Sequence, residues 1–375
     1  MLAEAESLLR EGRGRAEDAL PVALRALRRA AGRDDAATTT LPALGLVAEI
    51  YLELGDATAA REYFLQAVSL DPEGRVPETL GGGAEKFLWL AQLSEEGGQD
   101  SVEWFERGAA VLRREIGALG EGEGEGGEEK RKKLAGALCG MVEVYMTDLS
   151  WEPSAEAKCE SLISEALLVA PRCAEPLQTL ASVRISQTRI PEARKALGDS
   201  MGIWRDLEPE DAAVPDFPTR ISLARLLMEV EMEEEALGVV ERLVQEDDGS
   251  VEAWYLGGWC LYLLGMKQRK KHDERNGAAE GDAMEDANGC DEDEEDLLTQ
   301  TMVSSREWLR QSLKLYELVE YEDERLKDHA MELVEELDAI IGERGEDEVD
   351  EGEEEWNGFG EESEKEQEDE EMDEG

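Results

Sequence analysis

The chain has 375 residues and carries 92 acidic against 39 basic side chains, which gives a formal net charge of −53 and a pI near 4.2. So large a negative charge argues against direct binding to nucleic acid or to an anionic membrane and favours a cationic partner. No stretch is apolar enough to be expected to span a membrane. The five cysteines contain no CxxC pair, so we predict neither a zinc site nor a disulfide framework.

The first 40 residues are predicted to form an atypical capping pair of helices and a linker. Alanine and leucine recur at helical spacing within residues 1–31, and Gly12 and Gly14 mark the break between the two helices. Residues 34–40 are expected to be the linker. Terminal repeats of a repeat protein are usually atypical, which is consistent with a cap.

The clearest repeat signal in the chain lies in residues 44–72. Large, small and aromatic residues alternate there at Leu44, Val47, Ala48, Tyr51, Ala60, Phe64, Ala67 and Pro72. This is the spacing of a tetratricopeptide (TPR) repeat, in which small residues let two helices approach closely and an aromatic fills the space between them. One such unit cannot bury its own apolar faces, so the segment predicts neighbouring units.

Degenerate copies of this pattern follow along the chain. Helix pairs are expected at about 86–112, 134–171, 177–200 and 220–243, and a sixth begins at Trp254 and is completed by residues 304–319. A last helix covers about 323–341. The sequence therefore predicts an all-α, right-handed TPR superhelical solenoid of about six to seven helix pairs over residues 41–341.

Three polar segments accompany the predicted solenoid. They are a flexible loop at 117–129, a disordered insert at 267–296 and a disordered acidic tail at 342–375, where residues 343–375 hold 19 acidic and 2 basic side chains. None of them has enough apolar residues to bury a core. Short basic runs at 130–133 and 267–271 are either nuclear import signals or counter-charges for nearby acid.

The sequence offers no catalytic set. The only histidines, His272 and His329, lie among charged residues, and no glycine-rich phosphate-binding motif occurs. We predict that the protein is not an enzyme and that it uses no cofactor and no metal.

A peptide-binding groove is predicted on the concave face of the solenoid, where first-helix positions between the packing positions are exposed. By register these positions are Glu49, Glu53, Gln92, Glu95, Glu143, Met146, Glu175 and Gln178, with Tyr255, Trp259 and Tyr262 in the sixth unit. Carboxylates pair with Lys and Arg, and aromatic rings accept guanidinium groups, so this set suits a basic segment.

Two strings carry a family resemblance. KFLWLAQLSEEGGQDSVEWFERGAAVL (residues 86–112), with the unit before it, and EAWYLGGWCLYLLG (residues 252–265) resemble the fungal TPR chaperones dedicated to large-subunit ribosomal protein four. The resemblance covers roughly residues 40–345. It implies a dedicated chaperone that binds and shields the basic internal loop of the newly synthesised ribosomal protein. It also implies escort from the cytoplasm to the nucleus for ribosome assembly, with a nuclear import receptor as a candidate further partner.

Two other interpretations stay open from the sequence. The chain is either a generic TPR scaffold or cochaperone, with acid serving solubility alone, or an acidic histone-type chaperone that acts mainly through its tail.

Overall fold

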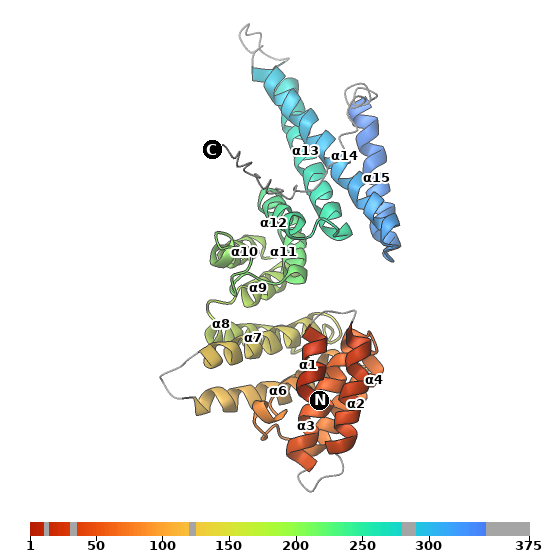
Figure 1. Cartoon of the computed structure of the whole chain (residues 1–375). Coiled ribbons are helices and arrows are strands. Elements are labelled where there is room, and N and C mark those ends of the chain that lie inside the picture. The colour runs from red at the N-terminus through yellow and green to blue at the C-terminus, as the bar shows by residue number, and fades with distance from the viewer. Residues whose placement is uncertain (11–14, 31–35, 120–124, 280–289, 343–375) are drawn as a thin grey trace, which may run out of the picture. The chain divides into compact units, whose positions relative to one another are not determined.

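The computed structural model describes residues 1–10, 15–30, 36–119, 125–279 and 290–342, and all regular structure in that part of the chain is helical (Figure 1). Two compact units are present, Met1–Cys260 and Leu261–Gly375. The α-helices are α1 (Leu2–Arg10), α2 (Ala16–Ala30), α3 (Ala36–Glu53), α4 (Ala57–Leu70), α5 (Glu85–Gln92), α6 (Gly98–Ala118), α7 (Glu125–Met146), α8 (Ala155–Val169), α9 (Glu175–Ser186), α10 (Ile190–Trp204), α11 (Phe217–Glu229), α12 (Glu233–Glu246), α13 (Val251–Ala279), α14 (Cys290–Leu318) and α15 (Glu324–Ile341), with one 3₁₀ turn, η2 (Glu78–Leu80).

The helix pair α3/α4 shows why the repeat pattern specifies this architecture. Ala48 and Ala60 are fully buried, which lets the two helices approach closely. The rings of Tyr51 and Tyr63 stack beside them at a centroid distance of 5.5 Å. Asp56 caps α4, because its carboxylate accepts a 2.9 Å hydrogen bond from the Ala59 amide. The predicted TPR unit at 44–72 is confirmed.

The same arrangement continues through the first unit as successive helix pairs. Alanines at the equivalent positions of later pairs, including Ala181, Ala193, Ala224 and Ala236, are again fully buried. One continuous apolar core extends from Ala48 on α3 to Val183 on α9. The all-α TPR solenoid predicted from the sequence is confirmed, with seven helix pairs and a last helix in the described part of the chain.

The predicted N-terminal linker at 34–40 is wrong from residue 36 onward, because α3 already begins at Ala36, and residues 34 and 35 lie outside the described part of the chain. The first turns of α3 pack against α4 and α2. Leu41 and Leu44 are buried with Ala67 of α4, and Leu27 of α2 packs against the same cluster. Burial therefore extends the helix beyond the repeat pattern, although α3 contains Pro42.

The flexible loop predicted at 117–129 is also wrong at both of its ends. Helix α6 runs to Ala118 and α7 begins at Glu125, and residues 120–124 lie outside the described part of the chain. Ion pairs hold this end of α7 in place. Lys130 pairs with Glu115 of α6, and Lys133 lies 2.6 Å from Glu85 of α5.

The disordered insert predicted at 267–296 is wrong at both of its ends. Helix α13 continues to Ala279 and α14 begins at Cys290, so only residues 280–289 lie outside the described chain. Opposite charges four residues apart, Arg269 with Asp273 and Lys270 with Glu274, favour helix there without any apolar periodicity. The predicted acidic tail lies outside the described residues from position 343 onward.

The second unit contains the later part of α13 together with α14 and α15. Gly265 of α13 faces α14 closely, since a Cβ added there would lie 3.2 Å from Met302. Between α14 and α15, the buried guanidinium of Arg306 lies 3.1 Å from the Asp338 carboxylate. A helix predicted at 323–341 is confirmed as α15, which Asp323 caps.

Candidate functional site: an acidic face on the first helices

Carboxylates gather on the first helices of successive pairs in the first unit. We call these residues the acidic face: Glu6 on α1, Glu49 on α3, Glu85 on α5, Glu143 on α7, Glu175 on α9 and Asp216 at the start of α11. Two groups within it interact electrostatically, one made of Glu6, Glu49 and Glu85 and the other of Glu143, Glu175 and Asp216.

In the first group, the surroundings shift the pKa of Glu49. Its side chain is half-buried on α3. Burial, and then the negative charges of Glu85 and Glu6, raise the pKa of Glu49 to about 7. Near neutral pH this carboxyl is therefore divided between its neutral and charged forms, and an approaching cation would favour the charged form.

The second group shows the same effect around Glu175. Burial, followed by the charges of Glu143 and Asp216, raises the pKa of Glu175, and Lys132 opposes the shift only in part. Desolvation by the surrounding protein raises the pKa of Glu143 as well. Among the described residues, none of Glu49, Glu143 and Glu175 has a basic side chain within 4.0 Å to form an ion pair.

The remaining acidic and amide positions predicted for the groove differ in exposure. Glu53, Gln92 and Glu95 are exposed near the ends of α3 and α5. Met146 is half-buried and packs against the main apolar core. Gln178 is buried, with its amide nitrogen 3.4 Å from the Ser200 hydroxyl, so the structure does not present it at the surface.

The predicted aromatic cluster is divided between the two units. Tyr255 is buried in the first unit and contacts Trp259, with ring centroids 5.8 Å apart. Tyr262 belongs to the second unit and donates a 2.5 Å hydrogen bond to Glu336 of α15. Because Tyr255 is buried, the structure does not present this ring at the surface.

Three residues of the acidic face, Glu6, Glu85 and Asp216, were not predicted from the sequence. Glu85 is the first residue of α5, as Glu175 is of α9, so an alignment of helix starts would have found it. Asp216 lies in the spacer that precedes α11, where its carboxylate accepts a 3.0 Å hydrogen bond from the Thr219 amide. Its position beside Glu175 depends on the path of that spacer, which no periodic pattern encodes.

The described residues contain neither a candidate metal site nor a candidate membrane span. No group of three or more histidine, cysteine, aspartate or glutamate side chains is placed to hold a metal ion. None of the described helices is both long enough and apolar enough to cross a membrane.

The chain is similar to a known repeat family and to two described proteins. The tetratricopeptide repeat family matches residues 41–73. A protein of Emericella nidulans described as a probable assembly chaperone of rpl4 is 50% identical over 366 residues, which span 96% of this chain and 88% of the relative. A Schizosaccharomyces pombe protein of the same description is 34% identical over 299 residues, 80% of each chain.

A solved structure agrees with these relatives. Residues 1–338 of an assembly chaperone of RpL4, Acl4, are 54% identical to this chain, with a TM-score of 0.63 over 72% of this chain and 97% of that one. The resemblance inferred from the sequence is confirmed, and the chain belongs to the family of assembly chaperones that these relatives represent.

Proposed function

We propose that the acidic face binds a basic internal segment of rpl4, the protein named in the descriptions of the relatives. The observation that carries this proposal is the placement of carboxylates on the first helices α3, α5, α7 and α9, where neighbouring negative charges raise the pKa of Glu49 and Glu175. Neighbouring carboxylates that repel one another are unfavourable in the free protein. Lysine or arginine side chains placed between them remove that repulsion and form ion pairs in a partly dehydrated site.

Shielding from RNA follows from the same contacts. A basic segment binds RNA mainly through its charge, by replacing the counterions of the phosphates. A segment whose cations are already paired with Glu49, Glu143 and Glu175 has few left for phosphate. In this proposal the chaperone keeps rpl4 soluble until ribosomal RNA competes for the segment in the assembling large subunit.

A titration with pH tests the proposed contacts. Affinity for rpl4 is expected to rise up to about tenfold between pH 6 and pH 8, because a carboxyl with a pKa of about 7 must lose its proton to pair with a cation. In the free chain, stability has the opposite dependence on pH. The folded protein disfavours the ionised form of Glu49, so stability falls as pH rises through 7. Glu49→Gln should flatten the pH dependence of binding measured by calorimetry, and an unchanged slope would count against a role for Glu49.

Escort to the nucleus is a second part of the proposal. In it, the import receptor binds a signal in the client rather than one in the chaperone. The basic run at 130–133 lies within α7, where Lys130 pairs with Glu115 and Lys133 lies within 2.9 Å of Glu78. A helical, ion-paired run is poorly suited to an extended receptor groove. A fluorescently tagged chaperone is expected in cytoplasm and nucleus, and to leave the nucleus when rpl4 synthesis is stopped. Unchanged nuclear entry would point to a signal in the chaperone itself.

A further inference from the structure

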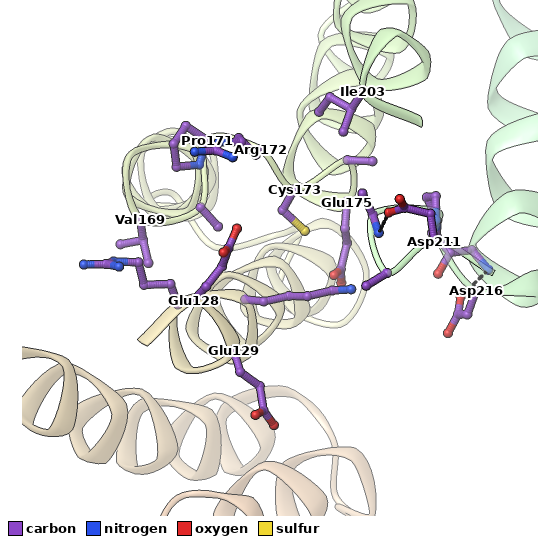
Figure 2. Close-up of a pocket in the computed structure, with 18 of the residues that line it drawn as sticks. Glu128, Glu129, Val169, Pro171, Arg172, Cys173, Glu175, Ile203, Asp211 and Asp216 are labelled. Carbon is purple, nitrogen blue, oxygen red and sulfur yellow. Dashed lines mark hydrogen bonds between the residues drawn. The ribbon is translucent and has the colours of Figure 1, made fainter. Parts of the chain in front are cut away.

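A large pocket lies in the first unit, beside Glu175 of the acidic face (Figure 2). Its volume is about 1380 Å³, and its walls come from the N-terminal turns of α7, the turn between α8 and α9, and the spacer between α10 and α11. Such a volume exceeds the usual range for small-ligand pockets and suits several residues of a peptide.

Part of the wall is apolar. Val169, Pro171 and Ile203 line it, and so does Leu168, whose side chain is 82% exposed. Exposure of so much apolar area to water is unfavourable. Leu168 also lies next to other apolar groups that line the same pocket. A partner that covered Leu168 and Ile203 would bury apolar area from both sides.

The charged part of the wall is predominantly acidic. Carboxylates come from Glu128, Glu129, Glu175, Asp211 and Asp216, against the basic groups of Arg131, Lys132 and Arg172. Figure 2 shows Glu175 and Asp216 on the same side of the pocket, away from Val169 and Pro171. Val169 and Pro171 therefore lie away from the carboxylates of Glu175 and Asp216, and the rim of the pocket is continuous with the acidic face through Glu175.

We propose that this pocket anchors a large apolar side chain of the client, with a lysine or arginine next to it in sequence. The apolar group lies against Leu168 and Pro171, and the cation faces Glu175 and Asp216. This inference rests on the proposed function, because it concerns the same basic client. It adds a selectivity that charge alone does not give, because a segment of uniform lysine would pair with Glu175 and Asp216 but leave Leu168 uncovered.

Two synthetic peptides of equal charge test the proposal, one with phenylalanine among its lysines and the other with serine in the same positions. The phenylalanine peptide is expected to bind the full chain about tenfold more tightly. Ala213→Trp, at an exposed position of the pocket wall, should remove this preference and leave the serine peptide unaffected. Ala157→Trp, at an exposed position of α8 outside the pocket, is the matched control and should change neither affinity.

The outcomes separate the two proposals. Equal affinity of the wild-type chain for both peptides, or a preference that survives Ala213→Trp, overturns the pocket while leaving the acidic face intact. Failure of both peptides to bind overturns the acidic face as well. Circular dichroism melting of each variant verifies that the added tryptophan leaves the fold unchanged.

Discussion

Replacing Glu49, Glu143 and Glu175 together by lysine is expected to weaken rpl4 binding by at least about 100-fold. Each replacement removes an attractive carboxylate and places a cation opposite a cation of the client, and two of the three positions, Glu49 and Glu175, are partly buried. Truncation of one partner in a desolvated charge pair costs about 2 kcal/mol or more, so the reversals at the partly buried Glu49 and Glu175 are enough to reach the stated loss. Fluorescence anisotropy with labelled rpl4 measures the effect.

A matched control separates the acidic face from net charge. Glu103 on α6 and Glu234 and Glu241 on α12 are exposed on second helices, and their triple replacement by lysine changes the net charge by the same amount. Because these positions lie outside the acidic face, binding should fall less than about threefold. Equal losses in the two triple variants would mean that only overall charge matters, as in a general acidic chaperone.

The second large effect is expected at a buried ion pair that links α5 to the end of α4. Lys86 and Asp71 lie 2.9 Å apart, with side chains only 4% and 5% exposed. Lys86 also donates a 2.9 Å hydrogen bond to the Gly83 carbonyl. Burial disfavours ionisation of Asp71, but hydrogen bonds from Lys86 and from the Arg75 amide outweigh it and lower the pKa of Asp71.

Lys86→Met is expected to lower the free energy of unfolding by about 3 to 5 kcal/mol, because it leaves the Asp71 charge buried without its partner. Denaturant unfolding followed by circular dichroism measures the loss. Lys195→Met, at an exposed position of α10, should cost less than about 0.5 kcal/mol. A loss below about 1 kcal/mol for Lys86→Met would show that water or a local rearrangement compensates the aspartate.

Family membership shows that the chain is an assembly chaperone and not an enzyme, as the sequence predicted. The fold was predictable for a local reason. Ala48 and Ala60, or Ala181 and Ala193, meet across one helix pair and are twelve residues apart in the chain. Contacts between residues so near one another in the chain produce a periodic sequence pattern. That pattern located every helix pair.

Features that depend on distant segments were not predictable in the same way. Lys133 donates hydrogen bonds to Glu78 and Glu85, about fifty residues earlier in the chain. No local sequence pattern therefore predicts that the start of α7 is helical. Asp216 joins Glu175 only through the path of a spacer. Register correctly placed Glu49, Glu143 and Glu175 on one set of helices, but it could not show that Gln178, three residues further along α9, is buried against Ser200.

Zero-length cross-linking of carboxylates to lysines in the complex with full-length rpl4, read by mass spectrometry, tests the central claim most directly. We expect cross-links from Glu49, Glu143 and Glu175 to lysines of one basic internal segment of rpl4, in an order that follows α3, α7 and α9. Cross-links confined to residues 343–375, or spread evenly over the second helices, would contradict the acidic face as the client-binding surface.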